Sequence, residues 1–278
     1  MNRQHVLRHI AGMLAAIVML TVLLMVEQGP SSIAYADPII DPLYPEQRKQ
    51  VAIVIDDFGN KMEGTEQILQ LPVKITIAVM PFMPSSKADA EAAHRMGHDV
   101  IVHMPMEPKK GNPSWLGPGA IMANQSDQEI EDRVRRAIDD IPFAVGMNNH
   151  MGSKVTGDKR IMRIVLKVCK EKGLFFLDSR TNYRSVTNEI GKELGVPVMN
   201  NHLFLDDEIT DSHVSKQWSK VEQLLEKQSP FVVIGHVGTG GKNTSSVLHR
   251  VIPNAKEHIQ FVRASELMDN PPPPMYTQ

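Results

Sequence analysis

Short apolar runs rich in Val and Ile alternate with longer amphipathic stretches between residues 50 and 268, and this alternation most constrains the fold. Apolar runs of about four to eight residues are typical of buried strands, whereas apolar residues three or four apart are typical of helices. The expected strands are residues 51–55, 74–79, 99–103, 143–148, 174–178, 196–199, 231–234 and 259–263. The expected helices are residues 85–96, 127–140, 159–172, 214–228 and a shorter one after Ser245. A strand then a helix, repeated about seven or eight times, predicts a parallel sheet in an α/β fold.

Two further features favour a barrel. The runs 51–55 and 231–234 are apolar throughout, as expected for a sheet covered on both faces. No Gly-rich phosphate loop follows the first strand, which argues against an open, doubly wound sheet. We therefore predict an α/β fold with a single distorted (β/α)7-8 barrel.

Ser126 and Glu129 have the spacing of a capping box at the start of helix 127–140.

The two ends of the chain have a different composition. Residues 1–36 combine Arg3 and Arg8, an apolar run over 10–26 and the small-residue sequence ending at Ala36, which is typical of a secretory signal peptide cleaved after Ala36. An uncleaved membrane anchor is the alternative. Residues 37–49 are expected to be a linker, 50–268 the barrel domain and 269–278 a Pro-rich tail. The sequence thus predicts a protein exported to the cell envelope or beyond.

Composition excludes several classes of protein. The formal net charge of −2 leaves no basic footprint for nucleic acid. Cys169 is the single cysteine, so an intramolecular disulfide is impossible, and its apolar neighbours predict a buried thiol. No pattern in the chain indicates an oligomer, and a monomer is expected.

Ionisable side chains collect at the carboxyl ends of the expected strands. These residues are Asp56, Asp57, His103, His150, Asp178 and His236. Barrel enzymes place their active sites at this end of the strands. The placement therefore predicts one shared site rather than scattered surface charge.

Each of these residues also has an ordinary structural interpretation. Asp56 and Asp57 precede Phe58-Gly59, a sequence that suits a simple strand-to-helix turn. His103 alone could be a hydrogen-bonded packing residue. Taken together, a carboxylate and two imidazoles on different strands suit one divalent metal, with zinc the first choice, and leave further groups for acid–base chemistry. This combination predicts a metal-dependent hydrolase.

The remaining histidines after residue 36 and an acidic turn are expected to be structural or solvated. They are His94, His98, His202, His213, His249, His258 and the turn Asp206-Asp207-Glu208. The turn lacks the alternating ligand spacing of a calcium loop.

The residues quoted so far resemble the divergent polysaccharide deacetylase branch of the NodB-like carbohydrate esterases, over about residues 51–268. In typical members one strand ends in two aspartates, a catalytic base and a metal ligand, which would be Asp56 and Asp57. Typical members also carry a Gly-His followed by a His-x-x-x-His pair. Here Gly97-His98 precedes His103, and Glu107 stands where the second histidine of the pair would be.

That departure from the pattern requires a replacement ligand, and His150 is the candidate. The resemblance then implies a metal triad of Asp57, His103 and His150, with Glu107 as a spare or supporting group. It further implies that His236 is the catalytic acid and that Asp178 orients it. Arg180 is the candidate replacement for the arginine that steadies the base, since the usual arginine is absent.

The resemblance implies an exported, metal-dependent deacetylase that removes N- or O-acetyl groups from a cell-envelope polysaccharide. Trp115, in the loop 111–119, is the candidate platform for a sugar ring, although it could equally pack that loop against the domain. Two alternatives remain. One is a catalytically silent protein of this fold that binds glycan or an envelope partner. The other is a different metal hydrolase such as a phosphoesterase, which would need a second metal and more carboxylates.

Overall fold

The computed structural model describes residues 49–268. The predicted signal peptide, its cleavage after Ala36, nearly all of the linker and the Pro-rich tail lie outside the described residues. Within residues 49–268, no helix combines the length and apolar character needed to cross a membrane. The first strand begins at Lys49, which pairs with Ile259.

In the described part of the chain, nine strands form one sheet, and every pair in it is parallel. The strands are β1 (Lys49–Phe58), β2 (Thr76–Val79), β3 (Asp99–Met106), β4 (Ala144–Met151), β5 (Phe175–Asp178), β6 (Val198–Asn200), β7 (Leu203–Phe204), β8 (Phe231–His236) and β9 (Ile259–Val262). Their order is β6-β5-β4-β3-β2-β1-β8-β7, and β9 pairs with the first part of β1.

The sheet is strongly curled, and the strands at its two edges, β6 and β7, follow one another in the sequence. β6 pairs with β5, whereas β7, two residues further on, pairs with β8 on the other side of the sheet. One extended stretch thus connects the two ends of the sheet. The predicted distorted barrel is confirmed, and the C-terminal ends of the strands converge around one opening.

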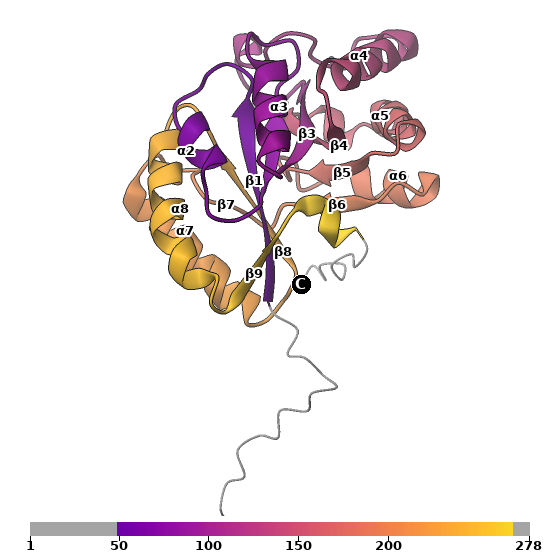
Figure 1. Ribbon diagram of the computed structural model, residues 1–278. Coiled ribbons are helices and arrows are strands. Elements are labelled where there is room, and N and C mark those ends of the chain that lie inside the picture. Colours follow the sequence, from indigo (N-terminus) through magenta and orange to yellow (C-terminus); the bar gives the residue numbers. More distant parts are fainter. Residues whose placement is uncertain (1–48, 269–278) are drawn as a thin grey trace, which may run out of the picture. The chain divides into compact units, whose positions relative to one another are not determined.

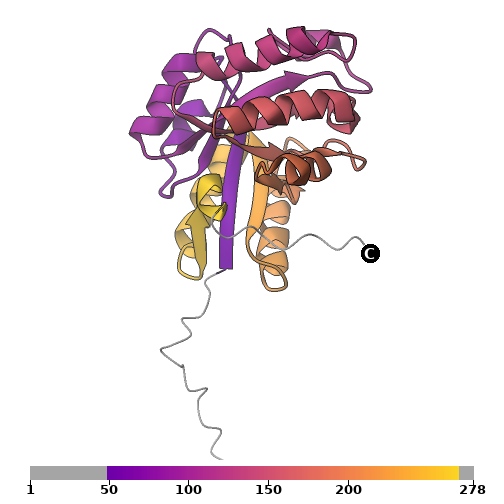
Figure 2. The same ribbon diagram turned by 90° about the vertical axis from the view of Figure 1, so that its right-hand side faces the viewer.

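Helices surround this curled sheet on the outside (Figures 1 and 2). They are α2 (Thr65–Leu69), α3 (Ser86–Arg95), α4 (Asp127–Asp140), α5 (Lys159–Glu171), α6 (Thr187–Leu194), α7 (Asp211–Leu225) and α8 (Gly241–Ala255), with short 3-10 turns at Pro113–Trp115, Val155–Gly157 and Ala264–Leu267. Residues Val51 to Ile55 of β1 are fully buried because β1 lies in the middle of the sheet. The Cys169 thiol is buried as predicted, and burial raises its pKa to about 12.

Local signals explain where several helices begin. Ser126 and Glu129 form the predicted capping box at the start of α4. α7 begins at Asp211, earlier than predicted, because the Thr210 side chain accepts a hydrogen bond from the backbone N–H of His213. α8 is longer than predicted and begins at Gly241, after Gly240 has reversed the chain in the left-handed region with φ 86°.

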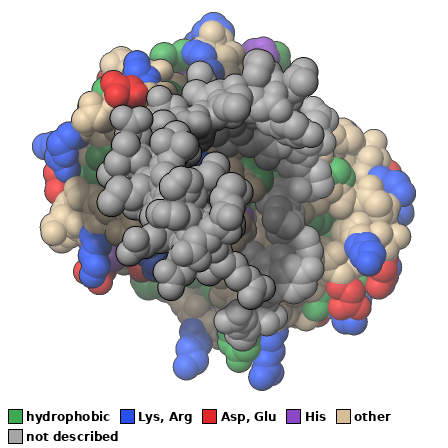
Figure 3. Space-filling model, turned by 90° about the horizontal axis from the view of Figure 1, so that it is seen from below, with side chains coloured by type: hydrophobic (Ala, Val, Ile, Leu, Met, Phe, Trp, Pro, Cys, Tyr) green, Lys and Arg blue, Asp and Glu red, His purple; other side chains and the backbone are tan. Residues whose placement is uncertain are grey.

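Charged side chains of both signs lie next to one another around the face at which β1 begins (Figure 3). On the part of that face left uncovered by grey atoms, neither sign forms a continuous patch. This distribution agrees with the small net charge of the chain.

Candidate metal centre and its acid–base partners

The end of β1 departs from regular strand geometry. Its pairing with β2 shifts register between Ile55 and Phe58, and Asp57 adopts φ 69° in the left-handed region. Such a conformation costs about 1–3 kcal/mol for a residue other than glycine and is found mostly at functional sites. Successive strand residues normally point to opposite faces. The irregularity allows two consecutive carboxylates, those of Asp56 and Asp57, to approach the same histidine, His103.

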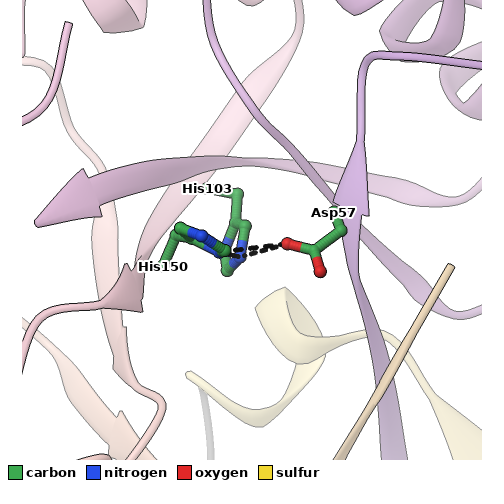
Figure 4. A group of neighbouring side chains, drawn as sticks. All are labelled: Asp57, His103 and His150. Carbon is green, nitrogen blue, oxygen red and sulfur yellow. Dashed lines mark hydrogen bonds and ion pairs between the residues drawn. The ribbon is translucent and has the colours of Figure 1, made fainter. Parts of the chain in front are cut away.

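Asp57, His103 and His150 converge from the C-terminal halves of β1, β3 and β4 (Figure 4). Oδ1 of Asp57 lies 3.2 Å from Nε2 of His103 and 3.0 Å from Nδ1 of His150. The two imidazole nitrogens are 3.1 Å apart. Three potential ligand atoms therefore form a nearly equilateral triangle.

Hydrogen bonds on the far side of each ring fix where the protons are. The Asn148 amide donates through Nδ2 to Asp56, so its Oδ1 faces Nδ1 of His103 at 2.7 Å and accepts a hydrogen bond from the N–H of that nitrogen. Nε2 of His150 likewise lies 3.1 Å from the carbonyl oxygen of Trp115, which can only accept. The nitrogens left unprotonated, Nε2 of His103 and Nδ1 of His150, are the two that face each other. A histidine that ligates a metal is usually held in this way.

The three converging atoms fit a divalent cation. Oδ1 of Asp57 is buried and has no hydrogen-bond partner within residues 49–268, and each imidazole, in the tautomer set by its far-side partner, presents a lone pair to it. Ligand atoms about 2.0–2.1 Å from a tetrahedral zinc ion are about 3.3 Å apart, close to the spacings seen here. Two nitrogens and one oxygen are also a common zinc ligand set that keeps a position open for water.

The directions of the pKa shifts indicate that the cluster of Asp57, His103 and His150 stabilises a positive charge. Burial opposes ionisation of Asp57, but His103 and His150 outweigh it and hold the pKa of that carboxyl well below its usual value. Burial also opposes a charge on His103, yet Asp56 and Asp57 together raise the pKa of the imidazole. A bound cation would supply the positive charge that these carboxylates stabilise.

The Asp56 side chain is less exposed to solvent than that of Asp57. Its side chain is 2% exposed, and its Oδ1 accepts a hydrogen bond of 2.8 Å from Asn148. Burial raises the pKa of Asp56, against the lowering effect of His103 and His236. A carboxylate whose pKa is raised is a better proton acceptor, so the arrangement suits a general base.

His236, at the end of β8, is held by Asp206 and not by the predicted Asp178. Oδ1 of Asp206 lies 2.8 Å from Nδ1 of His236, and Oδ2 accepts hydrogen bonds from the backbone N–H of His236 and from Thr244, each of 2.7 Å. Burial lowers the pKa of His236, but Asp206, helped by Asp56 and Asp57, raises it to about 9. His236 is therefore protonated at neutral pH and suited to donate a proton.

The prediction that Asp178 orients His236 is wrong. Asp178 is fully buried at the end of β5, where its carboxylate accepts hydrogen bonds from the backbone N–H of Arg180 and from Thr187. It ties the loop after β5 to the start of α6. Arg180 does not steady Asp56 through any hydrogen bond or ion pair within residues 49–268, and Asn148 donates to Asp56 instead.

Glu107 and Trp115 also have defined positions. The Glu107 carboxylate accepts hydrogen bonds of 2.6 Å from the backbone of Ala123 and from Lys154, so it anchors the loop after β3 and lies outside the metal triad. Trp115 is 64% exposed, so its ring does not pack the loop down. Its backbone carbonyl nevertheless orients His150.

Asp206 is the main residue that sequence reasoning missed. It was expected in a solvated turn, yet its side chain is 6% exposed. The two-residue strand Leu203–Phe204 places Asp206 at the same end of the sheet as the other candidates, but a strand this short gives no recognisable pattern in the sequence. Asn148 was recognised only as a polar residue needing a partner.

The fold and site define an α/β-barrel protein with an Asp/His/His cluster at the strand ends. Residues 53–268 match the family model for divergent polysaccharide deacetylases, and the chain belongs to that family. The resemblance stated from the sequence is thereby confirmed.

Two curated relatives share this sequence over most of their length. An uncharacterized protein of Haemophilus influenzae is 36% identical over 231 residues, which cover 82% of this chain and 81% of that protein. The uncharacterized protein YibQ of Escherichia coli is 34% identical over 222 residues, which cover 80% of this chain and 68% of that protein. The crystal structure of the uncharacterized protein ATU2773 from Agrobacterium tumefaciens shares the fold, with a TM-score of 0.74 at 21% identity over 81% of this chain and 91% of that one.

Proposed function

We propose that this protein is a metal-dependent hydrolase that removes acetyl groups from a cell-envelope polysaccharide. The observation that carries the proposal is the convergence of Asp57, His103 and His150, whose three potential ligand atoms lie 3.0–3.2 Å from one another. Family membership supports the reaction class. Zinc is the metal that this ligand set suits best.

Asp57, His103 and His150 would hold the metal, with Asn148 and the Trp115 carbonyl fixing the two rings. When bound, a divalent ion of this kind lowers the pKa of a water ligand and polarises a carbonyl oxygen. The protein itself supplies the proton transfers. Asp56 accepts the proton of the attacking water, because burial has raised its pKa toward the range of a useful base.

His236 acts at the second step. Asp206 keeps the ring protonated and turns its other nitrogen, Nε2, away from the Asp206 carboxylate. The backbone of His236 pairs in register with Asp56, so acid and base stand next to each other on adjacent strands. His236 gives its proton to the departing sugar amine or hydroxyl, and acetate is released.

Trp115 supports the carbohydrate part of the proposal. Its exposed ring lies on the loop whose backbone holds His150, so a sugar stacked on the ring is placed beside the ligand cluster. Export through residues 1–36 remains part of the proposal, since an envelope polysaccharide is reached only outside the cytoplasm.

The first test measures metal content per chain and acetate release together. The protein is reconstituted with zinc and assayed on N-acetylated and O-acetylated glycans. We expect about one zinc per chain and release of acetate. The variants His103→Ala and His150→Ala should lose the metal and the activity. His258→Ala removes an exposed imidazole and should lose neither.

Two other results have clear meanings. Stoichiometric zinc without acetate release from any acetylated glycan would favour the catalytically silent, glycan-binding alternative. A chain that takes up no zinc while its circular dichroism is native would exclude the metal-dependent mechanism. The half-buried His150 is the safer variant for folding, since its side chain is 17% exposed against 2% for His103.

A further inference from the structure

We propose that the polysaccharide acted on is anionic, with its negative groups held by two basic loops at one side of the site. This inference rests on the proposed function and adds the chemical class of the substrate. The basic loops are residues 108–119, after β3, and 179–188, after β5. Their cationic residues are Lys109, Lys110, Arg180 and Arg184.

These loops carry positive charge that no acidic side chain balances. Neither 108–119 nor 179–188 contains an aspartate or glutamate. Several basic residues elsewhere in residues 49–268 form ion pairs with acidic ones, such as Lys154 with Glu107 and Lys159 with Glu189. None of the four cationic residues of the basic loops makes an ion pair within residues 49–268. In a chain with a net charge of −2, this local excess of positive charge calls for an anionic partner.

Hydrogen bonds place both loops directly beside the candidate metal centre. The backbone N–H of Lys109 donates to Ser153, and the Thr181 hydroxyl donates to the carbonyl of Met151, at 2.9 and 2.7 Å. Both acceptors lie within three residues of His150. Nζ of Lys109 also lies 3.4 Å from Oδ1 of Asn182, so the two loops contact each other across the end of β4.

Exposed aromatic rings accompany the charges. Trp115 and Tyr183, one on each basic loop, are 64% and 81% exposed. The guanidinium of Arg184 lies 5.3 Å from the centre of the Tyr183 ring. Sugar rings stack on exposed aromatic rings, while guanidinium and ammonium groups bind carboxylates and phosphates. An aromatic ring beside a free cation therefore fits a sugar that bears an acidic group.

Another segment at the C-terminal ends of the strands, the turn after β7, carries the other sign of charge. The turn after β7 contains Asp207 and Glu208, whose side chains are 59% and 75% exposed and approach the single imidazole of His213. Negative groups on the polysaccharide are repelled there and attracted at the basic loops. The charge difference sets the direction in which an anionic chain lies across the site.

Binding can be tested separately from catalysis. The full chain carrying His236→Ala is titrated with three acetylated probes: a neutral chitin hexasaccharide, a hyaluronan hexasaccharide with carboxylates, and a poly(N-acetylglucosamine 1-phosphate) oligomer. We expect the anionic probes to bind about tenfold or more tightly than the neutral one. The preference should fall as salt rises from about 0.05 to 0.5 M, since screening weakens exposed charge pairs. Comparing the two anionic probes assigns the recognised group as carboxylate or phosphate.

Two variants make the test specific. Lys110→Gln/Arg184→Gln removes two charges whose side chains form no hydrogen bond with any other residue of 49–268, and should weaken binding of the anionic probe about three- to tenfold. Its affinity for the neutral probe should be unchanged. The matched control Lys220→Gln/Lys227→Gln removes two exposed charges in α7 and in the segment after it, and should leave both affinities unchanged.

The outcomes separate this inference from the proposed function. Equal binding and equal deacetylation of neutral and anionic glycans would overturn the anionic substrate and leave the deacetylase intact. Charge-selective binding with no acetate release by the zinc-loaded parent chain would overturn the catalytic proposal alone. Tight binding to vesicles containing anionic phospholipid, lost in Lys110→Gln/Arg184→Gln and without preference among the glycans, would assign the loops to a membrane surface instead.

Discussion

A single carboxylate, that of Asp206, determines the proton on His236. Its Oδ2 accepts two hydrogen bonds, from the His236 backbone and from Thr244, while Oδ1 holds Nδ1 of the ring. An asparagine at this position would keep its oxygen toward the two donors and turn its NH2 group toward Nδ1. That nitrogen would then have to be unprotonated, and the ring would be neutral.

Asp206→Asn should therefore shift the alkaline limb of the pH–rate profile to lower pH. In the parent protein the pKa of His236 is about 9, so acetate release should decline only above that pH. In the variant the pKa should approach the ordinary value of about 6.5, and kcat at pH 8 should fall about thirtyfold. Steady-state acetate release between pH 5 and 10 measures the shift. Asp207→Asn makes the same chemical change one residue later and should leave the profile unaltered; an unmoved limb in Asp206→Asn would remove His236 from the acid role.

Residues at the ends of long apolar strands could be located from the sequence. Asp56, Asp57, His103 and His150 follow runs that are recognisable as strands, and the structure brings all four together. The partner of His236 could not be assigned correctly, because Asp178 and Asp206 both follow strands and only the curl of the sheet decides which is adjacent to β8. Hydrogen-bond partners such as Asn148 depend on side-chain packing that no spacing reveals.

At the scale of elements, the contact between α6 and β6 depends on one glycine. A Cβ on Gly191 would lie 2.3 Å from Cγ2 of Val198 and 3.1 Å from the carbonyl oxygen of Val196. Alanine is otherwise preferred over glycine inside a helix by about 1 kcal/mol. Close packing and helix propensity therefore act in opposite directions at this position.

Gly191→Ala should lower the free energy of unfolding by about 1–3 kcal/mol, because overpacking at a rigid strand outweighs helix propensity. Urea denaturation followed by circular dichroism measures the change. Val198→Ala removes the nearer contact, so the double variant should lose much less than the two single losses combined. Additive losses would show that the Val196 carbonyl, not the Val198 side chain, limits the approach of the helix.

Helices and strands were predicted correctly where the patterned segments were long, and were missed where these segments were short. The eight expected strands and five expected helices correspond to elements of the structure, with ends displaced by a few residues. β7 has two residues and α2 five, too few for a period to be recognised. α6 has eight residues, two of which are Asn188 and Gly191, so its composition resembles a loop.

For the whole molecule, the candidate metal centre connects three strands that are far apart in the sequence. A ligand that binds only the folded chain stabilises it by about 2.7 kcal/mol when present at about a hundred times its Kd. For a domain of this size we expect zinc to raise Tm by roughly 5–10 °C. Differential scanning fluorimetry with zinc, and with magnesium as a control that imidazoles bind poorly, measures the effect.

The zinc effect should depend on pH and on the triad. It should shrink as the pH falls, because protons compete with a metal ion for imidazole and carboxylate ligands. His150→Ala should abolish it. An equal rise in Tm for that variant would place the stabilising zinc at another site.

The link between Trp115 and His150 has a consequence for how this protein can change its specificity. The backbone carbonyl of residue 115, not its side chain, accepts the hydrogen bond from the imidazole. The side chain can therefore be exchanged by point mutation without altering the orientation of His150. Insertions or deletions in residues 111–119 move the carbonyl itself. Substrate choice can therefore change, in evolution or by engineering, through substitution of residue 115. The length of the loop 111–119 is expected to stay constant.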